Sequence, residues 1–351
     1  MRIVIASVQV PFVRGGAEIL EESLRDALRA AGHEVTIASL PFKWYPPERI
    51  LDHMLACRLL DLTESNGAPI DLVLGLKFPA YLISHPRKVL WLVHQHRAAY
   101  ELWEHPEAGY LARFPNGDRI RDAIRHADRR LIPEARAVFT ISEAVSGRLR
   151  RYSDVDSTPL YPPVPGAERF YGAEAEDYLF FPSRLTSIKR QGLVLEALAQ
   201  TREPVRVRFA GAADFLPIAE ALQDTARRLG LAGRVEWLGA IGEEEKCRQY
   251  ARALGVVFPP FDEDFGYVTP EAMLAAKPVL TCTDSGGPLE LVLDRETGLV
   301  ADPTPASLAA AMDLLWQNRS LAKAWGEAGR ERYHSLGITW PNVVERLLAC
   351  A

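Results

Sequence analysis

The sequence has few of the features that mark a membrane-spanning, metal-chelating or nucleic-acid-binding protein. Its 351 residues include four widely spaced cysteines and no Cys-x-x-Cys pair, so neither a zinc site nor a redox dithiol is expected. No apolar run reaches the about 18 residues of a membrane span, and the run at 2–8 is too short for a secretory signal. The formal net charge of −5 provides no basic footprint for nucleic acid. These absences predict a cytoplasmic protein with reduced thiols and no nucleic-acid partner.

Two successive stretches in which short apolar runs alternate with amphipathic segments make up most of the chain. The apolar runs predict strands at 2–8, 34–39, 71–76, 88–93, 137–141, 178–181, 205–210, 234–238, 255–258 and 278–282. Helical spacing predicts helices at 17–31, 48–62, 189–199, 216–229, 243–253, 305–333 and 340–348. Strands that alternate with helices indicate parallel sheets joined by crossover connections.

A proline-rich break separates the two stretches. Pro159, Pro162, Pro163 and Pro165 precede Gly166 and carry no helical period, which is typical of a linker. We therefore predict an α/β protein of two Rossmann-like domains, at 1–163 and 164–338. Because open α/β sheets bind ligands beyond the carboxyl ends of their strands, the functional residues are expected in the loops that follow strands.

The loop after the expected strand at 255–258 carries two glutamates that are candidate ligand-binding residues. Glu263 lies in the loop, and its carboxylate suits paired sugar hydroxyls. Gly266 permits close backbone approach to a ligand, and Thr269 is expected to cap a short helix that contains Glu271 in its first turn. A solvated loop charge and a helix-dipole partner are the structural alternatives for the two glutamates.

Two further segments follow strands in the same half of the chain. Ser183-Arg184-Leu185-Thr186-Ser187-Ile188-Lys189 offers two cations to a diphosphate, an arginine fork and a lysine point charge. Ser285-Gly286-Gly287-Pro288 is a glycine-rich turn that is expected to present backbone donors to phosphate oxygens. Solvated cations and an ordinary turn are the alternatives for each segment taken alone.

The order and spacing of these segments, Ser-Arg-x-x-x-x-Lys, then two glutamates eight positions apart, then Gly-Gly-Pro-x-Glu, resemble the retaining glycosyltransferases of family 4. Gly15-Gly16-Ala17-Glu18 and Val138-Phe139-Thr140-Ile141-Ser142-Glu143 resemble other parts of that family. The resemblance implies the GT-B fold, in which two Rossmann-like domains face each other across a cleft and the last helix, at about 339–351, packs on the first domain. One departure is Ala276, where the family usually has glycine.

The resemblance also implies a role for each matching residue. Arg184 and Lys189 would neutralise the donor diphosphate, Glu263 would bind the transferred sugar, and Glu271 would bind the ribose. The donor site that it implies comprises Gly15, Gly16, Ser183, Arg184, Lys189, Ile241, Glu263, Phe265, Gly266, Tyr267 and Glu271. The catalytic residues that it implies are His94, Glu263, Arg184 and Lys189.

The functional histidine is chosen from the run Val93-His94-Gln95-His96-Arg97, which follows a strand. His94 is preferred because it directly follows the apolar run, with His96 as its rival and a structural role for both as the alternative. Asp262-Glu263-Asp264 resembles an Asp-x-Asp metal signature, but its position between the glutamate motifs argues against a metal, and no cofactor is expected.

We therefore expect a metal-independent, retaining hexosyltransferase that moves a sugar from a nucleotide diphosphate sugar to a hydroxyl acceptor. UDP-sugar is favoured as the donor and GDP-mannose is next, while the acceptor is a sugar, a lipid-linked glycan or a small molecule. The arginine-rich stretch at 119–136 permits weak peripheral membrane contact, although its mixed charge is typical of a solvated helix face. The alternatives are a nucleotide-sugar epimerase on the same fold and a non-catalytic nucleotide-sugar-binding subunit.

Overall fold

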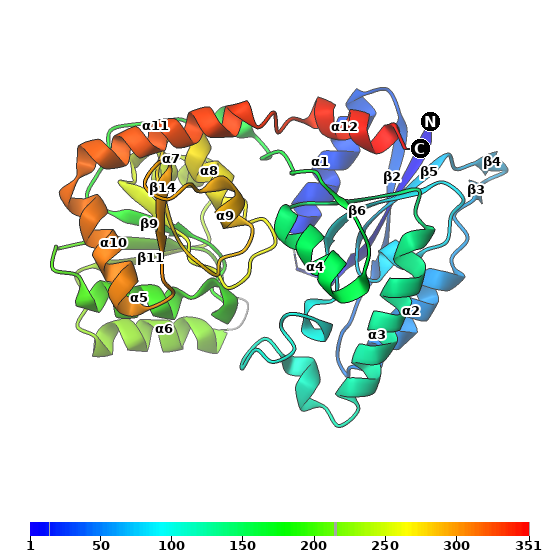
Figure 1. Cartoon of the computed structure of the whole chain (residues 1–351), viewed down its shortest axis with the longest axis horizontal. Helices are drawn as coiled ribbons and strands as arrows, with labels where there is room; N and C mark the ends of the chain where they lie inside the picture. Colours follow the sequence, from blue (N-terminus) through cyan, green and yellow to red (C-terminus); the bar gives the residue numbers. More distant parts are fainter. Residues whose placement is uncertain (14, 214–215, 351) are drawn as a thin grey trace. The chain divides into compact units, whose positions relative to one another are not determined.

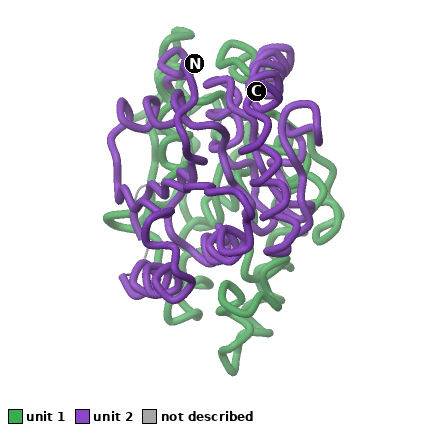
Figure 2. Tube along the Cα trace, turned by 90° about the vertical axis from the view of Figure 1, so that its left-hand side faces the viewer, with its two compact units in different colours: residues 1–165, 338–351 green, residues 166–337 purple. Residues whose placement is uncertain are grey.

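The computed structural model describes residues 1–13, 15–213 and 216–350, and these form two compact units (Figures 1 and 2). The first unit comprises Met1–Pro165 together with Ile338–Ala351, and the second comprises Gly166–Gly337. The division after Pro165 falls within the proline-rich break, close to the predicted domain boundary at 163. Within the described residues, no helix has the length and apolarity needed to cross a bilayer.

The first unit is built on a six-stranded sheet in the order β2-β1-β5-β6-β7-β8, in which all neighbours are parallel. Its strands are β1 (Arg2–Gln9), β2 (Glu34–Pro41), β5 (Leu72–Lys77), β6 (Lys88–His94), β7 (Ala137–Thr140) and β8 (Thr158–Pro159). A separate hairpin is formed by β3 (Glu64–Ser65) and β4 (Ala68–Pro69). The helices of this unit are α1 (Gly16–Ala30), α2 (Arg49–Leu59), α3 (Gly117–Leu131), α4 (Glu143–Ser153) and α12 (Trp340–Leu348).

The second unit repeats this architecture with a different strand order. All neighbours are again parallel in the six-stranded sheet β11-β10-β9-β12-β13-β14. Its strands are β9 (Leu179–Pro182), β10 (Val207–Ala210), β11 (Val235–Gly239), β12 (Gly255–Val257), β13 (Val279–Cys282) and β14 (Gly298–Ala301). Its helices are α5 (Gln191–Gln200), α6 (Leu216–Arg228), α7 (Glu243–Arg252), α8 (Val268–Leu274), α9 (Pro288–Leu291), α10 (Pro305–Gln317) and α11 (Arg319–Ser335).

The predicted elements differ from the observed ones at a few places. The helix expected at 305–333 is two helices, because Asn318 leaves the helical region at φ −121° and ψ 66° and caps α10 by donating from its side chain to the Leu314 carbonyl. Strand β14, a four-residue strand at the edge of the second sheet, was not predicted. The helix predicted at 48–62 ends at Leu59.

The C-terminal helix α12 packs on the first unit, as predicted, and runs beside α1 (Figure 1). Its buried residues Val343, Val344 and Leu347 lie on one helical face. The indole of Trp340 meets that of Trp91 edge to face at 6.3 Å between ring centroids, and Trp91 lies on β6. The last helix is therefore part of the core of the first unit.

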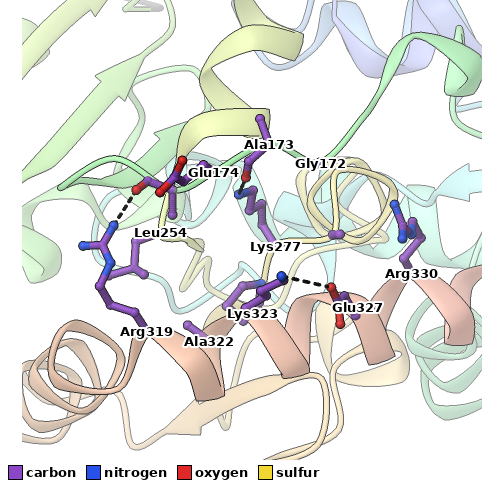
Figure 3. A pocket seen from close by; sticks show the side chains of 13 residues that line it. Gly172, Ala173, Glu174, Leu254, Lys277, Arg319, Ala322, Lys323, Glu327 and Arg330 are labelled. Carbon is purple, nitrogen blue, oxygen red and sulfur yellow. Dashed lines mark hydrogen bonds and ion pairs between the residues drawn. The ribbon is translucent and has the colours of Figure 1, made fainter.

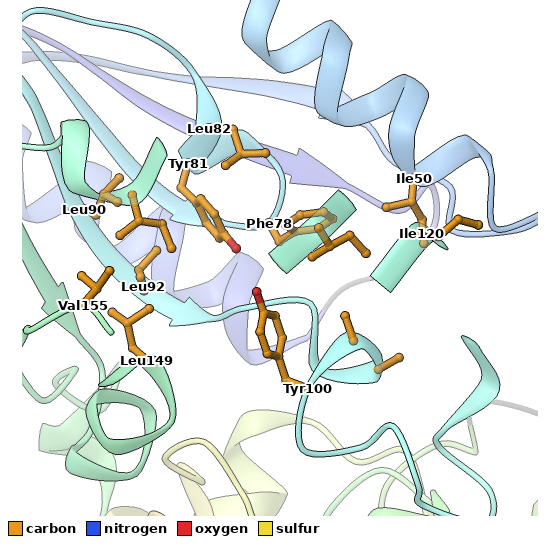
Figure 4. Packing of buried hydrophobic residues seen from close by; sticks show 14 of the residues in the cluster. Ile50, Phe78, Tyr81, Leu82, Leu90, Leu92, Tyr100, Ile120, Leu149 and Val155 are labelled. Atoms are coloured by element: carbon orange, nitrogen blue, oxygen red, sulfur yellow. The ribbon is translucent and has the colours of Figure 1, made fainter. Parts of the chain in front are cut away.

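A large cluster of buried hydrophobic residues in the first unit lies between the sheet and helices α2, α3 and α4 (Figure 4). Its aromatic members Phe78, Tyr81 and Tyr100 are buried, and Ile120 and Ile124 of α3 pack against them. The hydroxyls of Tyr81 and Tyr100 point toward each other within this apolar cluster. Both hydroxyls donate to the buried Asp128 carboxylate, at 2.9 and 2.7 Å, so the cluster contains a polar centre.

Candidate functional site

The topological switch point of the second sheet brings the predicted arginine/lysine segment next to the predicted glutamate segment. Strand β9 lies at the centre of this sheet, with β10 on one side and β12 on the other. The chain therefore leaves β9 and β12 in loops that share one edge of the sheet, which is where open α/β sheets bind ligands. The loop after β9 contains Lys189 and the loop after β12 contains Glu263.

Lys189 and Glu263 form an ion pair at this switch point. The lysine Nζ lies 2.6 Å from both carboxylate oxygens, and the two side chains are only 12% and 14% exposed. The loops are also joined through the backbone, since the Phe261 N–H donates to the Ile188 carbonyl at 2.7 Å. The ammonium lies 5.3 Å from the centroid of the Phe258 ring. The structure thus places Lys189, which the resemblance assigns to the donor diphosphate, next to Glu263, which it assigns to the transferred sugar.

The remaining residues of the segment after β9 border this pair. Arg184 is exposed, and its carbonyl accepts from the Gln191 side chain at 2.9 Å. Ser183 is half-buried and donates to the same carbonyl at 3.2 Å. The Thr186 hydroxyl is buried, and it has no hydrogen-bond partner among the described residues. A buried hydroxyl of this kind is costly unless a ligand or water satisfies it.

Arg190, which sequence reasoning did not assign a role, fixes the position of the loop that follows β13. Its guanidinium makes a two-point contact with the Asp284 carboxylate at 2.7 and 2.6 Å. The residue adopts the left-handed backbone conformation, with φ 61°. This fork-to-carboxylate geometry is the strongest ion-pair arrangement available to arginine, and it fixes the two loops to each other.

Glu271, which lies on α8, is buried and held by two residues of α7. Its carboxylate accepts from Lys246 Nζ at 2.9 Å and from the Tyr250 hydroxyl at 2.7 Å. Burial raises the pKa of the Glu271 carboxyl, an effect that the charge of Lys246 and the hydrogen bond from Tyr250 partly offset. Burial alone would lower the pKa of Lys246, but the carboxylates of Glu271 and Glu243 raise it.

Lys246 and Tyr250 were missed by the sequence analysis. Their spacing of four residues on α7 places them on one helical face. This spacing identifies them as partners of Glu271 only when the packing of α7 beside α8 is known. Ile241, a predicted donor residue, is half-buried in the loop between β11 and α7. Neither Lys246 nor Tyr250 belongs to the motifs that gave the resemblance.

Helix α8 begins one residue earlier than the predicted capping position. The residue that precedes it is Tyr267, and Thr269 is its second residue, so the predicted N-cap role of Thr269 is wrong. The backbone turns into the helix at Gly266, which has φ 76° and allows the first turn to start at Val268. Consequently the Thr269 hydroxyl is buried without a hydrogen-bond partner among the described residues, as is that of Tyr267.

Glycines allow the close packing of the loop that carries Glu263. At Gly266, an added Cβ would lie 2.8 Å from the Phe258 ring. At Gly286, with φ 68°, an added Cβ would lie 2.5 Å from the Glu263 carbonyl. The Gly287 N–H donates to that carbonyl at 2.9 Å, so this donor of the Gly-Gly turn supports the Glu263 loop instead of facing solvent. Phe265 is buried and meets Tyr267 edge to face at 5.7 Å.

In the first unit, the predicted glycine pair lies at the start of α1. Gly15 is the N-cap of this helix, and its N–H donates to the Glu18 carboxylate at 2.7 Å. That carboxylate also accepts from Lys77, at the end of β5, at 2.6 Å. Gly16 is the first residue of the helix. The opening loop is therefore joined to the carboxyl end of the neighbouring strand β5.

The two candidate histidines have different surroundings. His94 ends β6 and is half-buried, and its Nδ1 lies 2.6 Å from the Gln95 carbonyl, so Nδ1 carries the proton and Nε2 is the basic nitrogen of the neutral ring. His96 lies beside the Tyr110 hydroxyl, 2.8 Å from its Nε2, and packs on the Phe78 ring at 5.1 Å. Burial, with a smaller effect of His94, lowers the pKa of His96 to about 3. The low pKa favours the neutral form of the His96 ring, and the preference for His94 as the functional histidine stays a prediction.

The residue between the two histidines is anchored to the core. The Gln95 side-chain amide donates to Asp128 at 2.8 Å and to the Ser153 hydroxyl at 2.9 Å. Asp128 is fully buried on α3, and burial raises its pKa to about 6 although three hydrogen bonds favour its ionised form. This network holds the backbone carbonyl that orients His94, and the sequence analysis missed it because Asp128 lies within an arginine-rich stretch.

Among the described residues, no group of three or more His, Cys, Asp or Glu side chains is arranged to hold a metal ion. Asp262, the first residue of the Asp-x-Asp pattern, has a left-handed backbone at φ 44°, and its N–H donates to the Asp284 carbonyl at 2.9 Å. The backbone of the pattern is thus shaped by the pairing of two loops. Metal independence of the protein stays a prediction.

Comparison with known proteins agrees with this arrangement. Residues 169–332 match the sequence profile of the family described as glycosyl transferases group 1. A D-inositol 3-phosphate glycosyltransferase of Corynebacterium diphtheriae is 30% identical over 174 residues, which are 48% of this chain and 40% of that protein. The chain spans less than half the length of the first curated relatives that it matches.

Solved structures share the fold of the whole chain. Sucrose-phosphate synthase from Thermosynechococcus elongatus superposes with a TM-score of 0.80 at 19% identity, covering 99% of this chain and 97% of that one. HepE from Anabaena, in complex with UDP and glucose, gives a TM-score of 0.71 at 18% identity, and 99% of each chain is covered. The protein is therefore a GT-B protein. Residues 169–332 of its second unit are similar to the glycosyl transferases group 1 family.

Proposed function

We propose that this protein is a retaining glycosyltransferase that moves a sugar from a nucleotide diphosphate sugar to a hydroxyl acceptor. The observation that carries the proposal is the ion pair of Lys189 with Glu263 at the switch point of the second sheet. Such a pair places a diphosphate-binding cation next to an acceptor for sugar hydroxyls. The names of the curated relatives and of the solved structure with UDP and glucose support the same reaction class.

The proposed donor extends along the loops after β9 and β12. Arg184 and Lys189 neutralise the diphosphate, and this charge stabilises the leaving group as the glycosidic bond to phosphate weakens. Glu263 exchanges its contact with Lys189 for sugar hydroxyls. Glu271 accepts from the ribose hydroxyls in place of Lys246 or Tyr250. The unsatisfied hydroxyl of Thr186 supports a ligand in this region, because it lies in the loop that carries both cations.

The proposed reaction proceeds on one face of the sugar. The bond between the anomeric carbon and the phosphate oxygen breaks, and the acceptor oxygen forms its bond on the same face. The acceptor proton passes to the departing phosphate oxygen, so no carboxylate forms a covalent intermediate. His94, whose Nδ1 is held by the Gln95 carbonyl, is the proposed histidine that contacts the transferred sugar through Nε2. No metal takes part, and UDP is the preferred nucleotide with GDP next.

A thermal-shift titration tests the donor site. We expect UDP or GDP to raise the melting temperature of the wild type by several degrees in the presence of EDTA, since a ligand that binds the folded state stabilises it. Glu271→Ala is expected to lose most of this shift, because its carboxylate is the proposed ribose acceptor. Glu244→Ala, an exposed glutamate on the neighbouring α7, is the matched control and should keep the shift.

Two outcomes would contradict parts of the proposal. If no nucleotide stabilises the wild type more than Glu271→Ala, the donor site is elsewhere or absent. If EDTA removes the stabilisation, the metal-independent part is wrong. Turnover of the preferred UDP- or GDP-sugar with a panel of hydroxyl acceptors, followed by determination of the product anomer, tests retention. An inverted product would overturn the one-face reaction.

A further inference from the structure

A pocket of about 660 Å³ lies in the second unit, at the amino ends of strands β12 and β13 (Figure 3). Leu254 and Pro278, in its wall, directly precede β12 and β13, whereas the donor loops follow the carboxyl ends of β9 and β12. The segment 172–175, the turn at 276–278 and one face of α11 form the other walls. Its size suits a small-molecule ligand.

The charged residues of this pocket are mostly cationic. Lys277, Arg319, Lys323 and Arg330 line it, against two carboxylates, Glu174 and Glu327. The four cationic residues come from the turn after α8 and from the α11 face that looks into the pocket (Figure 3). This local excess of positive charge contrasts with the net charge of −5 for the whole chain.

Lys277 is the buried cation of the pocket. It is only 5% exposed, and its Nζ donates to the Ala173 carbonyl at 2.9 Å (Figure 3). Burial, together with the charge of Arg319, lowers the pKa of Lys277 to about 8. Among the described residues, burial and the charge of Arg319 account for this shift, and no carboxylate opposes it. Burying a lysine without a counterion is unfavourable, so an anion in the pocket would stabilise its charged form.

The other three cationic residues differ in how they are held. Arg319 is fixed by Asp177 at 2.6 Å and by the Ala175 carbonyl at 2.5 Å, so it shapes the wall. Lys323 has a loose ion pair with Glu327 at 4.0 Å. Arg330 has no ion pair in the described part of the chain, and Figure 3 shows it across the pocket from Arg319.

Close packing of the helix keeps this arrangement in place. Gly326 on α11 approaches the turn so closely that an added Cβ would lie 2.1 Å from the Ala276 carbonyl. Ala276 has a left-handed backbone, φ 52°, which directs the chain into Lys277. The position of Lys277 at the pocket thus depends on two features. These are the close approach of α11 at Gly326 and the left-handed backbone of Ala276.

We propose that this pocket binds a small anion that carries phosphate groups, at a site separate from the candidate donor site. Three cationic residues, Lys277, Lys323 and Arg330, converge on one cavity, and a ligand with more than one negative charge matches them better than a single carboxylate does. Glu174 and Glu327 also line the pocket, and Glu327 lies 4.0 Å from Lys323. This inference does not depend on the proposed transferase activity.

Isothermal titration of the full chain with inorganic pyrophosphate tests the site. Pyrophosphate also resembles the donor diphosphate, so it is expected to bind at the candidate donor site as well. Lys189→Gln, which alters the donor site alone, is therefore titrated beside the pocket variants to separate the two binding events. We expect a binding event that persists in Lys189→Gln and weakens by at least about tenfold in Lys277→Gln and in Arg330→Gln, since each removes a charge-assisted hydrogen bond. Arg130→Gln, an exposed arginine of the first unit, is the charge-matched control and should bind as the wild type does.

Three results would overturn the proposal. These are binding that is unchanged in both Lys277→Gln and Arg330→Gln, binding that weakens equally in Arg130→Gln, and absence of any pyrophosphate binding to Lys189→Gln at millimolar concentration. Lys277→Gln retains an amide that can donate to the Ala173 carbonyl, and Arg330 is exposed, so at least the second variant is expected to fold. Loss of pyrophosphate binding in Lys189→Gln but not in the pocket variants would leave the donor site supported and the pocket rejected.

Discussion

At the residue scale, the two histidines at the end of β6 differ in their surroundings, and this difference gives the preference for His94 a test. Both histidines are half-buried, but His96 packs between the Phe78 and Tyr110 rings, whereas the Nδ1 of His94 contacts the neighbouring Gln95 carbonyl. We predict that His96→Ala lowers the free energy of unfolding by about 2–4 kcal/mol, because it leaves a cavity and removes a hydrogen bond. His94→Ala should cost less than about 1 kcal/mol but reduce sugar transfer by about a hundredfold. Urea unfolding and turnover assays of both variants measure the two effects, and a reversed pattern would make His96 the functional residue.

The low pKa of His96 also predicts a dependence of stability on pH. Its pKa is about 3 in the folded protein and about 6.5 when the chain is unfolded. The unfolded state therefore binds a proton more readily, and stability is lost as the pH falls from about 6.5 towards 3, by up to about 1.4 kcal/mol per pH unit. In His96→Gln this contribution is absent. The unfolding free energies of wild type and variant should approach each other as the pH is lowered from 7 to 4. If the two curves run parallel, His96 has the same pKa in the folded and the unfolded chain.

At the scale of elements, α3 has a buried polar residue on the face that packs into the core. Asp128 accepts from Tyr81, Tyr100 and Gln95, while Asp122 on the same helix is exposed. We predict that Asp128→Ala lowers the free energy of unfolding by about 2–4 kcal/mol, because three buried donors lose their acceptor. Asp122→Ala, the matched control, should change it by less than about 0.5 kcal/mol. Equal effects in chemical unfolding would mean that the network adds nothing to stability.

The elements show which parts of the site a sequence can predict. The loops after β9 and β12 were predicted because parallel strands place their carboxyl ends together, and Lys189 and Glu263 indeed meet. The partners of Glu271 were not predicted, because Lys246 and Tyr250 come from a helix whose packing against α8 is a tertiary property. Asp128 was missed for the same reason, since its neighbours in the sequence are arginines and its partners lie on other elements.

Local backbone geometry was the other part that the sequence did not predict. Thr269 and Pro270 have the chemistry of a helix start, yet the helix begins at Val268 because Gly266 reverses the chain first. At position 276, where the family usually has glycine, this chain has alanine. Ala276 adopts the left-handed backbone conformation, with φ 52°, although it has a side chain. Both cases depend on packing around one residue, which a pattern of residue types does not contain.

At the scale of the whole molecule, the chain leaves the first unit at Pro165 and returns to it through α12. The helix covers Trp91 of the first sheet with Trp340, and Arg346 lies over the Phe139 ring at 5.7 Å. A residue near the end of the chain therefore stabilises the unit that contains its beginning. The second unit, Gly166–Gly337, has its own sheet and helices and does not include this helix.

This topology predicts that damage to α12 unfolds the first unit selectively. Leu347 is fully buried, so Leu347→Ala should cost about 2–5 kcal/mol, whereas Glu345→Ala on the exposed face should cost less than about 0.5 kcal/mol. Hydrogen exchange in Leu347→Ala should accelerate in β6 and α1, where the helix packs, while the strands of the second unit keep the protection of the wild type. Equal acceleration in both units would show that they unfold together and that α12 contributes to one cooperative structure.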